Sequence, residues 1–170
     1  LKFDDAAFDC VISQFGMMFF DDRKKSAEEI FRVLRPGGSL AIAVWRSVDH
    51  NPAYADVIGV LEEYVGQTAA DALRCPFSLG NPDEVTAALE SGGFSDITVL
   101  AKTEQAKFPS SRRMVEAELR GWLPMFGIVL SEDKIEEVLI ESDKTLAKYA
   151  GPDGEAIFPM SAHIFAAKKA

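Results

Sequence analysis

The sequence is poor in the residues that build metal centres and disulfide frameworks. Among its 170 residues are only two cysteines, Cys10 and Cys75, and two histidines, His50 and His163. Disulfide-rich domains and zinc sites need more such residues at regular spacing, so neither is expected here. Cys10 lies in an expected core strand and Cys75 in an expected loop. This sparse use of cysteine is typical of a reducing cytoplasm, where we place the protein.

Long apolar segments and an excess of basic charge are also missing. No apolar run approaches the roughly 20 residues that a membrane-spanning helix needs. The 18 basic and 27 acidic residues give a net charge of -9. Nucleic-acid binding requires clustered Lys and Arg, and the densest basic run, Arg23-Lys24-Lys25, reads as the solvated start of a helix. We therefore expect neither a nucleic-acid partner nor a membrane partner.

The first 45 residues predict a strand, a helix and a second strand. Residues 9–13 are a short apolar run typical of a buried strand, and residues 14–20 read as a loop that folds onto the core. Asp21 or Asp22 can cap the following helix, because apolar side chains then recur at helical spacing. That apolar face comprises Ala27, Ile30, Phe31 and Leu34.

Three residues predict the turn between this helix and the next strand. Pro36 cannot continue the helix, and Gly37-Gly38 permits the positive φ of a tight reversal. Residues 39–45 then form a continuous apolar run, the pattern of a parallel strand covered on both faces. The three elements together predict one right-handed βαβ unit.

Two later segments read as helical insertions between further elements of the sheet. The first, residues 46–80, contains a helix opened by Asn51-Pro52 and closed by Gly66, and a short helix over 68–73. Asn81-Pro82 then starts another helix, which Gly92-Gly93 stops, and residues 96–101 predict a strand.

The second insertion covers residues 107–155. Its first helix runs from Ser111 to Trp122, where Pro124 is expected to break it. Its second begins at Ser131-Glu132-Asp133. The side chains expected to face inward from this second helix are Ile135, Val138, Leu139, Leu146 and Tyr149. A loop over 151–154 and a final strand over 161–168 complete the chain, which we interpret as one domain of 170 residues with two lid insertions.

These motifs together resemble the C-terminal half of a class I S-adenosylmethionine-dependent methyltransferase. The resemblance rests on Leu1 to Asp9, on Val11-Ile12-Ser13-Gln14-Phe15-Gly16, on Arg35-Pro36-Gly37-Gly38 and on the strand that ends at Trp45. It is closest to the small-molecule, ubiquinone-biosynthesis-like type, which usually has Pro where this chain has Lys2. The resemblance implies an α/β, Rossmann-like sheet of parallel strands with an antiparallel last strand.

The same resemblance implies a cofactor, S-adenosylmethionine, and the residues that contact it. Leu1 would lie near the adenine, and Ser13, Gln14 and Phe15 would lie at the carboxyl end of the first strand, where open α/β sheets bind ligands. In this family a glycine-rich cofactor loop precedes the segment, and no Gly-x-Gly-x-Gly motif occurs in these 170 residues. We therefore expect this chain alone not to bind the cofactor.

The resemblance implies a small-molecule substrate held under the two insertions, and the aromatic and thioether side chains of these insertions would suit an apolar one. The candidate pocket residues are Met18, Trp45, Trp122 and Phe158, and core packing is the competing interpretation for each of them. His50 is a weak candidate for a general base, since a lone histidine in a loop is more often merely exposed.

Two alternatives to an active methyltransferase remain at this level. A non-catalytic association module could use half of the fold, because a strand without its usual neighbour leaves a sheet edge open for pairing with another copy. A nicotinamide-dependent α/β enzyme is disfavoured, since the sequence offers no glycine fingerprint of that class.

Overall fold

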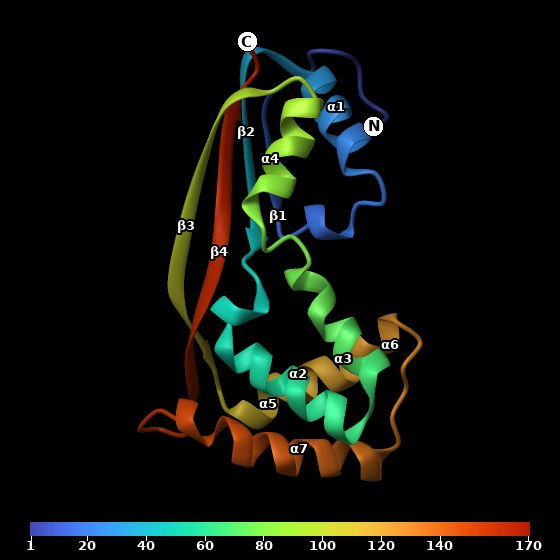
Figure 1. The fold of residues 1–170 in the computed structure, drawn as a ribbon, viewed down its shortest axis with the longest axis vertical. Coiled ribbons are helices and arrows are strands. Elements are labelled where there is room, and N and C mark those ends of the chain that lie inside the picture. Colours follow the sequence, from blue (N-terminus) through green and yellow to red (C-terminus); the bar gives the residue numbers. More distant parts are fainter. The chain divides into compact units, whose positions relative to one another are not determined.

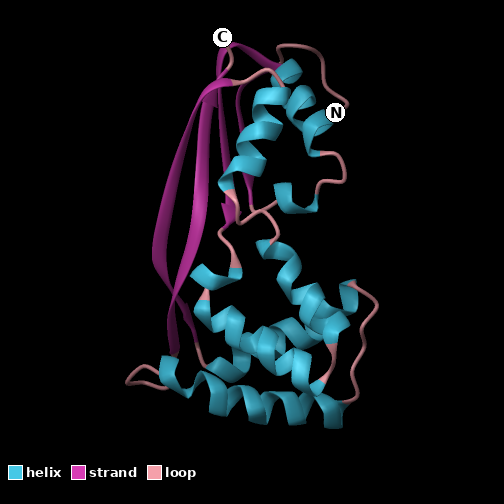
Figure 2. Ribbon diagram, in the orientation of Figure 1, coloured by secondary structure: helices cyan, strands magenta, loops and turns pink.

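The computed structural model describes all 170 residues as an α/β protein with one four-stranded sheet (Figures 1 and 2). Its strands are β1 (Phe8–Gln14), β2 (Leu34–Trp45), β3 (Ser95–Phe108) and β4 (Ala156–Lys168), in the order β1-β2-β4-β3. β1 and β2 run parallel, and β4 runs antiparallel to β2. The predicted fold class, with its antiparallel last strand, is confirmed.

Except for α6, the helices lie where caps and apolar spacing predict them. They are α1 (Arg23–Val33), α2 (Pro52–Tyr64), α3 (Gln67–Arg74), α4 (Pro82–Ser91), α5 (Ser111–Ala117), α6 (Leu123–Met125) and α7 (Glu132–Leu146). Short turns are η1 (Met17–Phe19), η2 (Val48–His50), η3 (Cys75–Phe77) and η5 (Ala147–Tyr149), and η4 (Glu118–Trp122) is π-helical. None of the helices combines the length and the apolar character that a membrane crossing requires.

The chain divides into two compact units. Unit 1 consists of Leu1–Ser47, Pro76–Lys102 and Ser161–Ala170, and unit 2 consists of Val48–Cys75 and Thr103–Met160. β3 and β4 are longer than the strands expected over residues 96–101 and 161–168, since β3 extends to Phe108 and β4 begins at Ala156. The boundary between the two units falls within both strands.

In unit 1, α1 and α4 cover one face of the sheet (Figure 1). The Asp22 side chain caps α1 by accepting a hydrogen bond from the Lys25 amide at 2.9 Å, and Asn81 caps α4 in the same way. Leu40, Ile42 and Val44 of β2 are buried against the helices. Every second side chain of β2 is therefore buried, and this alternation places α1 and α4 on one face of this part of the sheet.

β1 is more exposed than its apolar sequence predicts. We expected a buried strand with Cys10 in the core, but Cys10 is exposed and Ile12 is 72% exposed. β1 lies at the edge of the sheet, and Ile12 aligns with Ala41, which aligns in turn with Ala166, on the face opposite the core. Since Ala41 is only half-buried, β2 is not fully covered on both faces either. An apolar run can predict a strand but not which neighbours cover it.

The turn after α1 is a bulge within β2 rather than a connection before it. Leu34 already pairs with Phe8, and the next pair is Cys10 with Ser39, so residues 35–38 loop out of the ladder. Gly37 has a φ of +78°, the positive value that its sequence predicts.

Pro124 does not break the helical segment that precedes it, which corrects a second prediction. Helix α5 passes into the π-helical η4, and the Leu123 amide donates to the Glu118 carbonyl. Pro124 then occupies the first turn of α6, where its missing N–H leaves no hydrogen bond unmade. The chain therefore stays helical through this proline.

Unit 2 is built around a core of its own. Of the inward-facing residues predicted for α7, Ile135, Val138, Leu139 and Leu146 are buried there, whereas Tyr149 lies beyond the helix in η5 and is half-buried. Ser131 caps the helix through the Lys134 amide. Phe158 of β4 is 1% exposed, and its ring is surrounded by those of Phe108, Tyr54 and Tyr149. These aromatic contacts join β3, β4, α2 and η5.

Candidate functional site

An open hollow of about 600 Å³ lies beside β1 in unit 1 and contains two of the predicted cofactor residues. Leu1 and Ser13 line it together with Ile12, Phe19 and residues of α1. Leu1, Ile12 and Phe19 are 61%, 72% and 46% exposed. A hollow with exposed apolar side chains and a hydroxyl at a strand end can accept a ligand that has one apolar and one polar part.

Phe15 occupies a strained position directly after β1. Its φ of +53° is uncommon for a residue with a side chain, and such conformations collect at functional sites. The Phe15 amide donates to the Ala43 carbonyl at 2.9 Å, and its ring stacks on Trp45 with centroids 3.8 Å apart. The structure thus joins a predicted cofactor residue and a predicted substrate residue at the carboxyl ends of β1 and β2. Sequence spacing gave no signal for this stack, because the two rings are brought together by strand pairing.

Two arginines fasten the N-terminal segment to the end of α1. Arg32 donates to the carboxylates of Glu29 and Asp5 and to the Phe3 carbonyl, while Arg35 donates to both Asp9 oxygens at 2.7 and 2.8 Å. The hydrogen bonds from Arg32 are the largest cause that lowers the pKa of Glu29. These side chains fix the segment that carries Leu1, a role that their positions in the sequence did not reveal.

The remaining predicted residues of unit 1 differ in accessibility. Gln14 ends β1, pairs with Ala43 and is exposed. Met18 is 4% exposed and belongs to the core beneath the sheet. Burial gives Met18 a packing role in the described structure, while Gln14 stays available to a ligand.

The other predicted residues belong to unit 2. Trp122 packs against the core and donates from Nε1 to the Ala72 carbonyl at 2.9 Å. Phe158 is almost completely enclosed in that core. His50 lies on the exposed turn η2. The described contacts of Trp122 and Phe158 are those of packing residues.

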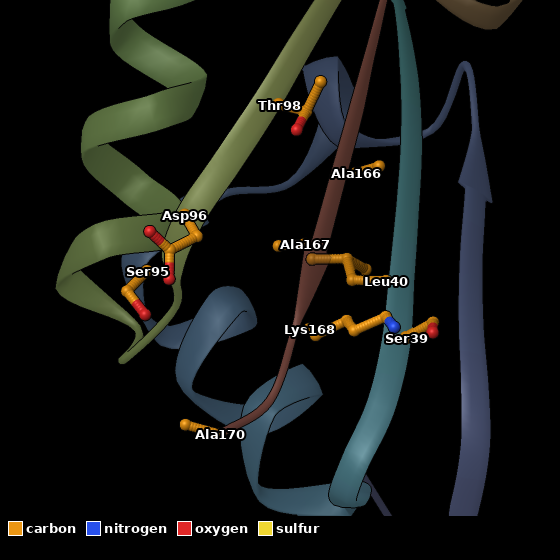
Figure 3. Close-up of a pocket in the computed structure, with 9 residues that line it drawn as sticks. All are labelled: Ser39, Leu40, Ser95, Asp96, Thr98, Ala166, Ala167, Lys168 and Ala170. Atoms are coloured by element: carbon orange, nitrogen blue, oxygen red, sulfur yellow. The ribbon is translucent and has the colours of Figure 1, made fainter.

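A second hollow, of about 440 Å³, lies elsewhere on unit 1 (Figure 3). It includes Ser39 at the start of the regular part of β2, Asp96 and Thr98 of β3, and Lys168 near the end of β4. Ligands of α/β sheets bind at the carboxyl ends of parallel strands, whereas Ser39 lies toward the amino end of β2. The hollow beside Ser13 is therefore the better candidate.

The sequence matches a known family at its N-terminal end. Residues 1–42 match the model of a methyltransferase domain. Over 42 residues, 25% of this chain and 16% of the relative, it is 48% identical to the ubiquinone/menaquinone biosynthesis C-methyltransferase UbiE of Pasteurella multocida. It is 25% identical to the methyltransferase tpcH of Aspergillus fumigatus over 101 residues, 58% of this chain and 36% of the relative.

An uncharacterized protein of Mycobacterium tuberculosis is 47% identical over 45 residues, 26% of this chain and 16% of the relative. The chain thus spans between 16% and 36% of the length of these curated relatives.

Solved structures share the fold. A proposed methyltransferase from an antibiotic biosynthesis pathway of Anabaena variabilis superposes with a TM-score of 0.60 at 17% identity, covering 96% of this chain and 68% of that one. The YcgJ protein of Bacillus subtilis gives a TM-score of 0.53 at 16% identity, covering 99% and 67%. Residues 1–42 thus match a methyltransferase domain, and the whole chain shares its fold with these solved structures.

Proposed function

We propose that the protein transfers a methyl group from S-adenosylmethionine to a small, mainly apolar molecule by in-line displacement. The observation that carries this proposal is the strained Phe15, stacked on Trp45 directly after β1, the parallel strand whose Ile12 and Ser13 line a mainly apolar hollow. The hollow suits the cofactor, because exposed apolar side chains can cover an adenine ring while Ser13 and Gln14 offer polar groups. Leu1, Ser13, Gln14 and Phe15 are the residues that would hold it.

Methyl transfer from a sulfonium needs little acid–base catalysis from these residues. When bound, S-adenosylmethionine supplies a methyl group already activated by its sulfonium. The chain then has to align the nucleophile and keep water away. Phe15 and Trp45 form an apolar wall suited to this, and Trp45 is the pocket candidate that the proposal retains. His50 would act as a general base only for a methyl acceptor that must lose a proton.

Cofactor affinity tests this function. By calorimetric titration we expect no S-adenosylmethionine binding to these 170 residues by themselves, which contain no Gly-x-Gly-x-Gly motif, and clear binding to the whole protein. In the whole protein Phe15→Ala should weaken binding about tenfold, or about 1.4 kcal/mol, by removing the stacked wall. The matched control is Phe126→Ala, which removes an exposed ring of unit 2. A gene product that neither binds the cofactor nor transfers methyl groups would refute the proposal.

The open sheet edge favours a second candidate function, association between copies of the chain. β1 has a neighbour on one side only, and Ile12 is exposed beside it. Exposed strand edges of apolar character pair readily, and a lysine at such an edge blocks pairing.

We expect light scattering to show a dimer of the 170-residue chain that Ile12→Lys converts to a monomer. The matched control is Ile140→Lys, which adds the same charge at a 45% exposed position of α7 and should leave the dimer intact. A wild-type chain that stays monomeric at high concentration would exclude this association.

A further inference from the structure

One arginine side chain joins two segments that line the hollow beside β1. Leu1, from the N-terminal segment, and Glu29, from α1, both line that hollow. Arg32 Nη2 donates to the Leu1 carbonyl at 3.2 Å and to Glu29 Oε2 at 2.8 Å, while its Nε donates to Glu29 Oε1 at 2.7 Å. Because the guanidinium is planar and its donors have a fixed geometry, these bonds set how the two lining residues lie relative to one another.

The N-terminal segment depends on side-chain contacts for its position, because it contains no helix or strand before β1. Leu1 and Phe3 are 61% and 54% exposed, so burial does little to hold them. Arg32 Nη1 extends its contacts along the segment, donating to the Phe3 carbonyl at 2.9 Å and to Asp5 Oδ1 at 2.6 Å. The Phe3 ring also meets that of Phe8 edge to face, with centroids 5.0 Å apart. Arg32 is therefore a main anchor of this segment.

A strained residue shows that such contacts impose the path of the segment. Ala6 has a φ of +51°, a value that residues with a side chain rarely adopt. Its amide donates to the Arg32 carbonyl at 3.0 Å, and Arg35 Nε donates to its carbonyl at 3.1 Å. Ordering the backbone of a free segment costs about 1–2 kcal/mol for each residue. A ligand that meets a segment already ordered by the protein does not bear that cost when it binds.

We propose that Arg32 is a positioning residue for S-adenosylmethionine, which acts by holding Leu1 and Glu29 in place in the hollow that receives the cofactor. This inference rests on the proposed methyltransferase function. Arg32 itself does not line the hollow, so its effect passes through the two residues that it holds. Without its side chain, binding of the cofactor has to order the segment that carries Leu1, and affinity falls.

Arg35 offers a comparison within the same region. It donates to both Asp9 oxygens and to the Ala6 carbonyl, so it also fastens the chain near the N-terminus. Neither Asp9 nor Ala6 lines the hollow. Replacing Arg35 therefore removes hydrogen bonds from the same part of the chain and leaves the link between Leu1 and Glu29 intact.

Calorimetric titration of S-adenosylmethionine into the whole protein tests the inference. Arg32→Gln should raise the dissociation constant about tenfold, the ratio that 1.4 kcal/mol produces. Arg32→Lys should raise it nearly as much, because an ammonium group lacks the planar set of donors that joins the two segments. Arg35→Gln should raise it less than about threefold. The matched control is Arg74→Gln in unit 2, which breaks ion pairs with Glu62 and Asp71 and should leave the dissociation constant unchanged.

Two further measurements separate positioning from a general effect on stability. Urea unfolding without cofactor, followed by circular dichroism, gives the free energy of unfolding of each variant. A residue that only stabilises the fold would change this free energy and leave the affinity of the folded protein as it was. In a double-mutant cycle, Glu29→Gln alone should weaken binding, and Arg32→Gln should weaken it less in that background than in the wild type, because the link is already impaired.

Unchanged affinity in folded Arg32→Gln, or an equal loss of affinity in Arg35→Gln, would overturn the inference and leave the proposed function standing. Fully additive effects of Arg32→Gln and Glu29→Gln would likewise show that Arg32 does not act through Glu29. A whole protein that binds no S-adenosylmethionine would overturn the inference and the proposed function together.

Discussion

Replacing Phe158 with alanine is expected to lower the free energy of unfolding of unit 2 by about 3–5 kcal/mol, the usual cost of emptying a buried aromatic site. Phe158 is 1% exposed, stacks on Phe108 with centroids 5.8 Å apart and meets Tyr149 at 5.9 Å. Because these rings come from different elements, they cannot all move inward to fill the space. A large cavity should therefore remain.

The two tryptophans make this loss measurable unit by unit. Trp45 belongs to unit 1 and Trp122 to unit 2, and the sequence contains no others. In a Trp45→Phe background, the fluorescence of Trp122 should report urea unfolding of unit 2 alone. Phe126→Ala, at a 44% exposed ring of the same unit, should cost less than about 1 kcal/mol. A Phe158→Ala loss as small as that of the control would show that Phe158 does not hold this core together.

The second large effect is expected at Gly92→Ala, where the free energy of unfolding of unit 1 should fall by about 1–3 kcal/mol through overpacking. Gly92 follows α4, and a Cβ at this position would lie 2.6 Å from the Ala27 Cβ and 2.7 Å from the Ala27 carbonyl carbon. The φ of Gly92, -79°, is open to any residue. The cost is therefore the steric separation of α4 from α1 and not backbone strain.

Gly59→Ala is the matched control for this substitution. Gly59 lies within α2 with nothing within 4 Å of the position of its Cβ. Alanine there should raise stability by roughly 0.5–1 kcal/mol, because glycine is the poorer helix residue. Urea unfolding followed through Trp45 for Gly92→Ala, and through Trp122 for Gly59→Ala, should give shifts of opposite sign. A stabilising Gly92→Ala would contradict the close approach of the two helices.

The helices could be predicted from the sequence because capping and helix-breaking residues mark their ends. Asp22, Asn81 and Ser131 cap the helices that they were expected to cap, since each cap acts on an amide two or three residues away. The prediction that Pro124 breaks the helix was wrong for a reason that is also local. A π-helical turn before it shifted the hydrogen bonding, so that the proline fell in a first turn instead of a helix interior.

Only part of the candidate site could be predicted from the sequence in the same way. Ser13, Gln14 and Phe15 were placed at the end of β1 because strand ends follow from local pattern and from the family resemblance. The Phe15–Trp45 stack, the fastening of the N-terminal segment by Arg32 and Arg35, and the hydrogen bond from Tyr54 to Glu118 were not foreseen. Each depends on partners at least 26 residues apart in the sequence.

The sequence by itself determined the order of the helices, the parallel first pair of strands and the positive φ at Gly37, because periodicity, caps and turn residues act over a few positions. Only the tertiary structure decided that β1 lies at an exposed edge, that Phe158 is enclosed in unit 2, and that Tyr54 donates a hydrogen bond to Glu118. Burial and charge pairing are sums over neighbours that are distant in the chain, and they exist only once those neighbours have been brought together.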